Sequence, residues 1–154
     1  MNALFADVPS ARLPESRDFY ARLLEMEVVF DSDWYVLLRD PRRPRLQLAF
    51  VAHDHESVPA AFRGPARGLL ITAEVDDVEG VHGRAREMGA TIAQELRDEE
   101  FGQRHFMAVD PNGLLVDVYE PIPFSAAFLE ANPAQGTRGA VSRSRTPPLT
   151  SRHS

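Results

Sequence analysis

A cluster of metal-binding residue types stands near the end of the first third of the chain. His53, Asp54, His55 and Glu56 are consecutive, and imidazole and carboxylate groups are common ligands of divalent metal ions. Two histidines separated by one residue at a strand end would place both rings on one side. No third fixed ligand accompanies them. We therefore interpret the cluster as part of a solvated linker.

A second candidate is the pair Arg104–His105, which begins a predicted strand after the loop FGQ. A guanidinium in a pocket can pair with a carboxylate of a ligand or with Asp117. An imidazole titrates near neutral pH and can therefore transfer a proton. Because side chains alternate along a strand, only one of the two can face a given side, and the sequence leaves open which one.

Several kinds of chemistry are excluded by residues that the chain lacks. It has no cysteine, so disulfides, thiolate metal sites and a cysteine nucleophile are ruled out. All 17 basic residues are Arg, so a lysine Schiff base is ruled out too. The start MNALFADVPS has no basic segment, and no apolar run approaches the length of a membrane span. We expect a cytoplasmic protein that does not insert into membranes.

The charge is unevenly distributed along the 154 residues. All 23 acids but only 13 of the 17 Arg lie before residue 138, which gives this part a formal charge of −10. An acidic surface repels phosphate backbones, so nucleic acid is not an expected partner. A neutral or cationic small molecule suits this charge better.

The chain also repeats itself. FYARLLEMEV, from Phe19, is similar to VHGRAREMGA, from Val81, at an offset of 62 residues. WYVLLRDPRRPRLQLAF, from Trp34, is similar to RHFMAVDPNGLLVDVYE, from Arg104, at an offset of 70. The two blocks keep their order, so the sequence predicts two copies of one structural unit, with a longer loop in the second.

Each copy has the pattern of a strand, a helix and three further strands. The strands are expected at 3–8 and 69–75 and the helices at 14–26 and 77–88, with Asp76 or Asp77 as the cap of the second helix. An Asp-Pro turn joins the last two strands of each copy, and Asp-Pro-Asn-Gly is a strong hairpin signal. The predicted fold class is α+β, with two tandem βαβββ modules in one domain over residues 1–124. Module one covers about 1–58, and module two covers about 67–122.

Residues 125–154 are expected to lie outside this domain. PFSAAFLEANP could form one or two helical turns that dock through Phe124, Phe128 and Leu129. From residue 136 onward the chain is rich in Gly, Ser, Thr, Pro and Arg, which cannot bury enough apolar surface to order a segment. We predict a short docking segment followed by a disordered tail.

The tandem repeat over residues 3–122 resembles the vicinal oxygen chelate superfamily, which contains the glyoxalases and the bleomycin-resistance proteins. The most specific piece is FGQRHFMAVDPNGLLVDVYEPI, a strand, a turn and a strand that ends in an acid. The resemblance implies two mixed sheets curled around a cavity, and usually a homodimer. It implies no single activity, because one fold hosts many functions.

Enzymes of this superfamily place His, Gln or Glu on the first and last strands of each module, where three or four ligands hold a divalent metal ion. Carried over to this chain, the last strands offer Gln47 and Asp117, which match at the offset of 70. The first strands offer Phe5 and Leu70, and neither side chain can bind a metal. A shift of two residues would supply Asp7, but the second module then offers only Thr72. We expect no metal site and no cofactor.

Gln47 and Asp117 then have two interpretations. They could anchor a ligand by hydrogen bonds, or they could be remnants of an ancestral site that bond each other or water. Tyr119 shares the alternation of Asp117 and could stack on a flat ligand. Trp34 and Arg104 correspond at the repeat offset and complete the predicted ligand-binding set.

Two functions follow from the resemblance. The first is a metal-independent small-molecule binding protein that sequesters a drug, as in antibiotic resistance. The alternative is a glyoxalase-like lyase or isomerase, or a dioxygenase, with a divalent metal and with Asp117 and His105 as catalytic residues. Whether the chain is an enzyme stays open at this point.

Overall fold

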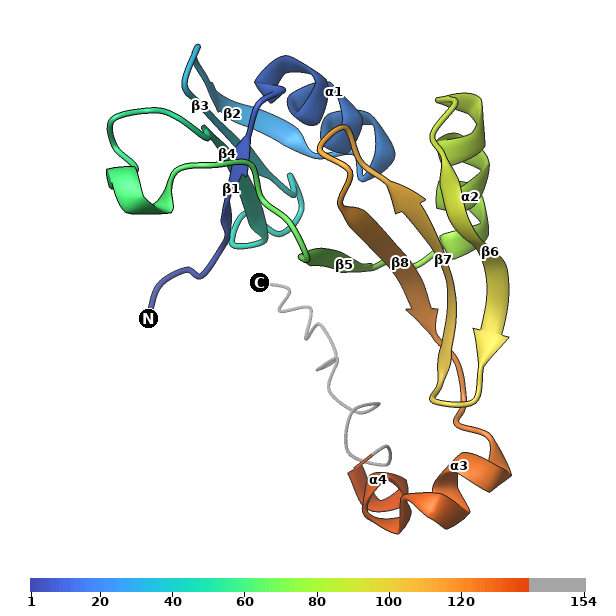
Figure 1. Ribbon diagram of the computed structural model, residues 1–154. Coiled ribbons are helices and arrows are strands. Elements are labelled where there is room, and N and C mark those ends of the chain that lie inside the picture. Colours follow the sequence, from blue (N-terminus) through green and yellow to red (C-terminus); the bar gives the residue numbers. More distant parts are fainter. Residues whose placement is uncertain (139–154) are drawn as a thin grey trace, which may run out of the picture.

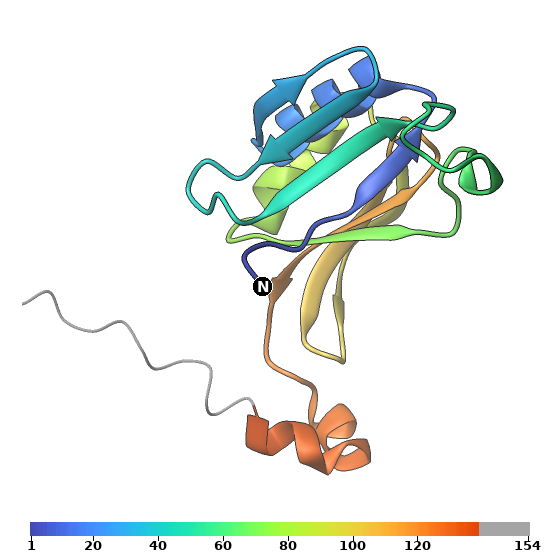
Figure 2. The same cartoon turned by 90° about the vertical axis from the view of Figure 1, so that its left-hand side faces the viewer.

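Two four-stranded sheets form the body of the computed structural model, which describes residues 1–138 (Figure 1). The element order is βαβββ followed by βαβββ, which confirms the predicted fold class. Both sheets are curved and open. The helices α1 and α2 lie on one side of them, and Figure 2 shows both helices behind the first sheet. The opposite side of the sheets, which we call the open face, is not covered by these helices.

The first module contains β1 (Asp7–Ser10), α1 (Leu13–Leu23), β2 (Glu27–Asp31), β3 (Tyr35–Arg39) and β4 (Gln47–Ala52). β1 and β4 pair in parallel and the others are antiparallel, in the order β1-β4-β3-β2. Pro14 in the first turn starts α1 with a preset φ angle. Tyr20 packs its ring on Phe50 with 5.2 Å between centroids, so β4 turns its even-numbered residues toward the helix.

The second module repeats this plan with β5 (Leu70–Glu74), α2 (Val78–Glu87), β6 (Ile92–Glu99), β7 (Gln103–Val109) and β8 (Leu115–Pro121). The strand order is β5-β8-β7-β6. Asp77 caps α2 by accepting a bond of 2.9 Å from the amide of Gly80, and the helix ends before Gly89, whose φ is +71°. Val78, Ala85, Phe106, Val116 and Val118 join the residues around Tyr20 and Phe50 in one core.

The turn between β7 and β8 fastens the second module to the first. Tyr20 donates a bond of 2.8 Å from its hydroxyl to the buried carboxylate of Asp110. Asn112, in the same turn, bonds both Ser10 and Ser16. These contacts join residues about a hundred positions apart, so they fix how the two modules sit against each other.

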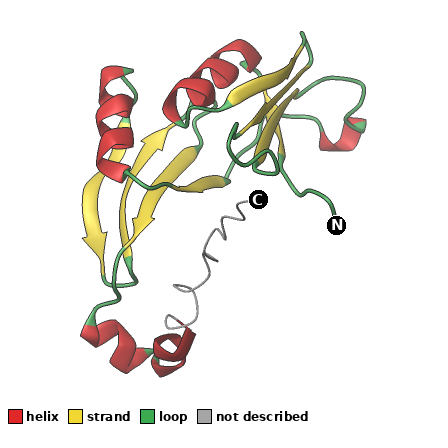
Figure 3. Cartoon of the chain, turned by 180° about the vertical axis from the view of Figure 1, so that it is seen from behind, coloured by secondary structure: helices red, strands yellow, loops and turns green. Residues whose placement is uncertain are grey.

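Short helices follow the second sheet. α3 (Ala126–Ala131) and α4 (Pro133–Arg138) lie on the side of the sheets away from α1 and α2 (Figure 3). Phe124 and Phe128 stack with 5.2 Å between ring centroids, and Ser125 is fixed to the β6–β7 turn by a bond from its amide to the carbonyl of Glu100. The disordered tail is predicted to begin at residue 136, but α4 continues to Arg138; the rest of the predicted tail lies outside the described residues. Within the described part, no helix is long and apolar enough to cross a membrane.

The structure corrects two predicted boundaries. The first strand occupies Asp7–Ser10 rather than 3–8, because pairing with β4 begins only at Asp7 opposite Ala49. α1 ends at Leu23 rather than 26, because Glu25 adopts a φ of 53° and the guanidinium of Arg84 bonds the carbonyl of Leu23.

The helices correspond at an offset of 65 rather than 62. The buried residues Leu13, Ser16 and Tyr20 of α1 match Val78, Val81 and Ala85 of α2. The similarity at 62 matched Arg22 to Arg84, and these two side chains do not occupy equivalent places on their helices. Burial against the sheet sets the helix register.

We expect Tyr20→Phe to lower the free energy of unfolding by about 1–2 kcal/mol, because it removes one donor from a buried carboxylate and leaves the ring in place. Urea denaturation measures this change. The matched control is Tyr35→Phe, whose hydroxyl bonds the exposed Asp7 and whose loss should cost less. Equal losses in the two variants would contradict a special role for the contact between the modules.

Candidate functional site

The open face of the second sheet carries a buried histidine between two carboxylates. Phe106, the neighbour of His105, belongs to the core against α2, so His105 points to the open face. Its Nδ1 lies 2.8 Å from Oδ1 of Asp117, and its Nε2 lies 3.0 Å from Oε1 of Glu99. His105 is only 3% exposed. The structure thus decides the open question of the Arg104–His105 pair in favour of His105.

The protonation of His105 depends on which neighbour bonds Nε2. Gln94 places its amide nitrogen 2.8 Å from Nε2 and can donate to the neutral ring, whereas Glu99 accepts from the charged ring. Burial lowers the pKa of His105, but the hydrogen bonds to Glu99 and Asp117 outweigh it and raise the pKa above 6.5. The hydrogen bond from His105 in turn lowers the pKa of Glu99. The two carboxylates therefore stabilise the charged form of the ring.

These residues do not fit a divalent metal ion. Within residues 1–138 no group of three or more His, Asp or Glu side chains is placed to hold one. On the parallel strands β5 and β8, the residue opposite Asp117 is Thr72, which adds no carboxylate or imidazole ligand. Both ring nitrogens of His105 already face carboxylates. Corresponding positions of the first module hold Asp7 and Ala49. We therefore derive no step through a metal.

The sheet register changes the correspondence predicted for Gln47. The β3–β4 turn closes with a bond from Asp40 N to Leu46 O, and the β7–β8 turn with one from Asp110 N to Leu114 O. The first turn is thus two residues longer, and the counterpart of Asp117 is Ala49 rather than Gln47. Gln47 still lies on the open face, where its amide bonds the carbonyl of Pro44 at 3.2 Å.

Gln47 also lines a pocket of about 500 Å³ between the modules, which we call the cleft. Three parts of the chain form its walls. They are the residues at the end of α1, the β3–β4 turn with the start of β4, and β5 with Val75 and Asp76 that follow it. Most of the lining is apolar, and the lining residues are Leu24, Met26, Asp40, Arg43, Leu46, Gln47, Leu48, Ile71, Thr72, Ala73, Glu74, Val75 and Asp76. The size and the mostly apolar walls are those of a small-molecule site.

The polar groups of the cleft are mainly carboxylates. Asp40, Glu74 and Asp76 lie beside Arg43, and Arg42 and Arg84 line the adjoining part of the pocket around the same three acids. Asp40 accepts from the amides of its own turn, and Glu74 accepts from the hydroxyl of Tyr119 at 2.8 Å. None of the three forms an ion pair with another residue of the described part of the chain. The two adjoining parts of the pocket are lined by five acids against three Arg, so negative charge is in excess there.

A family model for the glyoxalase/bleomycin resistance protein/dioxygenase superfamily matches residues 4–118. The chain belongs to this superfamily. Comparison with curated proteins gives no match.

Solved structures share the fold of this superfamily member at low identity. TnmS3, an antibiotic binding protein from Streptomyces sp. CB03234, is 22% identical with a TM-score of 0.60, over 79% of this chain and 96% of that one. A superfamily member from Sphaerobacter thermophilus DSM 20745 is 23% identical with a TM-score of 0.64, over 78% and 97%. A bleomycin resistance determinant encoded on the transposon Tn5 is 20% identical with a TM-score of 0.58, over 79% and 98%. At these identities the likeness shows the fold.

The other predicted ligand-binding residues lie apart from one another. Arg104 points to the side of the sheet that carries α2, where it bonds Asp98 and Glu79. Tyr119 lies on the open face, and its bond to Glu74 connects it to the rim of the cleft.

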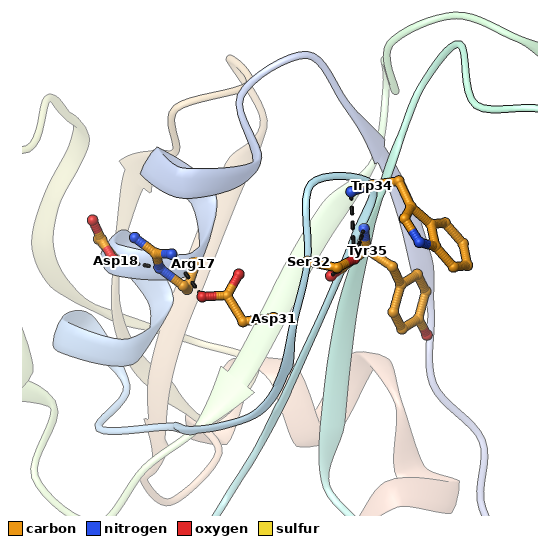
Figure 4. Close-up of polar contacts among 6 residues, drawn as sticks. All are labelled: Arg17, Asp18, Asp31, Ser32, Trp34 and Tyr35. Atoms are coloured by element: carbon orange, nitrogen blue, oxygen red, sulfur yellow. Dashed lines mark hydrogen bonds and ion pairs between the residues drawn. The ribbon is translucent and has the colours of Figure 1, made fainter.

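Trp34 lies in the first module, at the turn between β2 and β3. Figure 4 shows Ser32 in this turn, with its hydroxyl accepting from the amides of Trp34 and Tyr35. The ring of Trp34 stacks on His55 with 4.2 Å between centroids. His55 and the rest of its cluster are not placed to hold a metal ion. The cleft lining includes none of Trp34, Arg104, Asp117 and Tyr119.

Sequence reasoning missed Gln94, Glu99 and the acids of the cleft. Glu99 and Gln94 reach His105 because β6 is bulged at two places, which shifts its pairing with β7. No spacing rule predicts these bulges. For Glu74 a signal was present, because it follows Thr72 by two residues on a strand and must share its face.

We expect an NMR titration to give His105 a pKa above its ordinary value of 6.5. Asp117→Asn and Glu99→Gln should each lower this pKa, because each removes a negative charge next to the ring. Glu95→Gln is the control, since Glu95 bonds His82 instead. A pKa of His105 that is unchanged in both test variants would contradict the hydrogen-bonded arrangement.

The same groups set a pH window for stability. His105 has its pKa raised above 6.5 in the fold, so its contribution is complete below pH 6.5 and is lost as the pH rises through the folded-state value. Glu99 has its pKa lowered from 4.5, so its contribution is lost as the pH falls through its folded-state value. The pair therefore stabilises the fold most between about pH 4.5 and 6.5.

Proposed function

We propose that this chain is a metal-independent binding protein for a cationic, partly apolar small molecule, and that it sequesters such a molecule, as a drug-resistance protein does. The observation that carries the proposal is the cleft, in which three carboxylates without ion-pair partners surround apolar walls. A bound cation would pair with these carboxylates while its apolar part displaces water from Leu24, Met26 and Ile71.

The structural neighbours are consistent with this proposal. One is an antibiotic binding protein and another is a bleomycin resistance determinant. The alternative function, a metal-dependent lyase, isomerase or dioxygenase, requires ligands that residues 1–138 do not bring together. The cytoplasmic location stays a prediction from the sequence.

Gln47 and Glu74 have distinct roles in this proposal. Gln47 offers an amide at the start of β4, where it can bond a neutral polar group of the ligand. Glu74 is held by the hydroxyl of Tyr119, which fixes one carboxylate oxygen and leaves the other for the cation. The hydrogen bond that Tyr119 donates to Glu74, together with burial, raises the pKa of Tyr119, so this hydroxyl keeps its proton and remains a donor.

We expect metal-free bleomycin, or a member of a panel of cationic aromatic antibiotics, to bind the protein in a buffer that contains a chelator. Glu74→Gln combined with Asp76→Asn should weaken this binding, by about 1 kcal/mol or roughly fivefold in Kd for each carboxylate at contact distance in water. Isothermal titration calorimetry measures Kd for both forms.

The matched control is Glu56→Gln, an exposed acid in the linker outside the cleft, which should leave Kd unchanged. Two results would contradict the proposal. One is the absence of binding across the panel, and the other is binding that requires an added divalent metal or that survives the double substitution.

We also propose a homodimer formed through the edge of the first sheet. All five residues of β2 are exposed, and Val28, Val29 and Phe30 are 37–49% exposed. β2 is the last strand of its sheet, so one side of its backbone has no strand to pair with in the described chain. An apolar edge strand is a site for pairing with another chain.

Light scattering after size exclusion should give twice the chain mass of 17.2 kDa for the unmodified protein. Phe30→Lys should shift the mass toward that of one chain, because it places a charge on the proposed contact. Phe62→Lys is the control, since Phe62 is exposed outside the edge, in the short helix Ala60–Phe62. A protein that stays monomeric at all concentrations would contradict the dimer.

A further inference from the structure

We infer that the C-terminal segment of this chain, residues 139–154, docks in the cleft and competes there with the ligand. The inference shares with the proposed function only the location of the site. It assigns to the cleft a second occupant that is part of the protein itself, so that the free binding site is in equilibrium with a covered one.

The charges of the cleft and of the segment are complementary. The cleft and its adjoining part are lined by five acids, including Asp40, Glu74 and Asp76, against three Arg, and no ion pair within the described chain neutralises these three acids. The segment GAVSRSRTPPLTSRHS has three Arg and no acidic side chain. Guanidinium groups bind carboxylates through two parallel hydrogen bonds, which makes Arg the best suited cation for such a site.

In both the cleft and the C-terminal segment, apolar residues stand between charged ones. The cleft has apolar walls with the carboxylates among them, including Leu24, Met26 and Ile71. In the segment, Leu149 follows two prolines and lies between Arg145 and Arg152. An extended chain advances about 3.3 Å per residue, so each of these cations lies roughly 10–13 Å from Leu149. Leu149 could therefore contact the apolar walls while the two Arg reach acids on either side of it.

The C-terminal segment starts on the side of the sheets away from α1 and α2, where one rim of the cleft also lies. α4 ends at Arg138, and Figures 1 and 3 show α3 and α4 on the side of the sheets away from α1 and α2. Gln47, Thr72 and Glu74 form the rim of the cleft on this open face, whereas its apolar walls, such as Leu24 and Ile71, pack against the core. The 16 residues after Arg138 can span about 50 Å, which exceeds the diameter of a body with a radius of gyration of about 14 Å.

Weak contacts are sufficient for such a tethered segment. A tether of this length gives an effective concentration on the order of 1 mM. If the free segment bound with a Kd of about 0.1 mM, the tethered segment would cover the cleft about ten times more often than not. Ligand binding would then be weakened roughly tenfold, without any loss in the quality of the site.

The first test measures the docking without any small molecule. A synthetic peptide of residues 139–154 is titrated into the full chain that carries Arg143→Gln, Arg145→Gln and Arg152→Gln, with NMR detection. We expect saturable shifts at the cleft, with a Kd near 0.1 mM, and loss of binding when Glu74→Gln and Asp76→Asn are added. A peptide with the same three Arg→Gln changes is the control and should not bind.

The second test compares the unmodified chain with the triple Arg→Gln chain for the bleomycin or antibiotic probe that binds. We expect the triple variant to bind the probe roughly tenfold more tightly, with a ratio that does not depend on protein concentration. A ratio that falls on dilution would assign the docking to a second copy and overturn the intramolecular contact. Equal affinities would overturn the competition.

The two proposals fail separately in these experiments. If no probe binds but the peptide still occupies the cleft, the small-molecule function is wrong and the docking is confirmed. If probes bind and the peptide does not, or if the peptide binds equally well without Glu74 and Asp76, the docking is wrong and the ligand site is unaffected.

Discussion

A carboxylate buried between the two modules holds their relative position, and the site depends on that position. Asp110 receives hydrogen bonds from Tyr20 of the other module and from the amides of Asn112 and Leu114 in its own turn. A buried charge is tolerated only where such bonds replace water. Because the β7–β8 turn is fixed in this way against α1, β5 is placed beside the start of β4, and the cleft lies between them.

The same Asp-Pro turn has a different consequence in the first module. Among the described residues, the side chain of Asp40 bonds the amides of Arg42 and Arg43 in its own turn, and it lines the cleft. The repeat thus uses one residue type for two purposes, since Asp110 stabilises the assembly of the modules and Asp40 contributes charge to a binding surface. The β3–β4 turn has two more residues than the β7–β8 turn. This difference in length gives the carboxylate of Asp40 and the start of β4 another position relative to their sheet.

The two polar clusters differ in their ionic partners. His105, Asp117 and Glu99 hydrogen-bond one another on the second sheet, and this set stiffens the face that it occupies. Asp40, Glu74 and Asp76 in the cleft form no ion pair within the described chain, so their electrostatic potential acts on molecules in solution. This contrast is the reason to assign binding to the cleft rather than to the histidine.

The sequence by itself determined the repeat, the βαβββ order, a cap at Asp76 or Asp77, the hairpin at Asp-Pro-Asn-Gly and the absence of thiol and lysine chemistry. These features depend on local periodicity, turn chemistry and composition, which a single chain displays directly. The sequence also indicated that Gln47, Asp117 and Tyr119 share the face away from the helices, because side chains alternate on a strand. Only the tertiary structure decided that Ala49 is the counterpart of Asp117, that Glu99 meets His105, and that Asp40, Glu74 and Asp76 border one cleft. Turn lengths, bulges and the docking of one module on the other set these encounters, and they arise from packing between residues far apart in the chain.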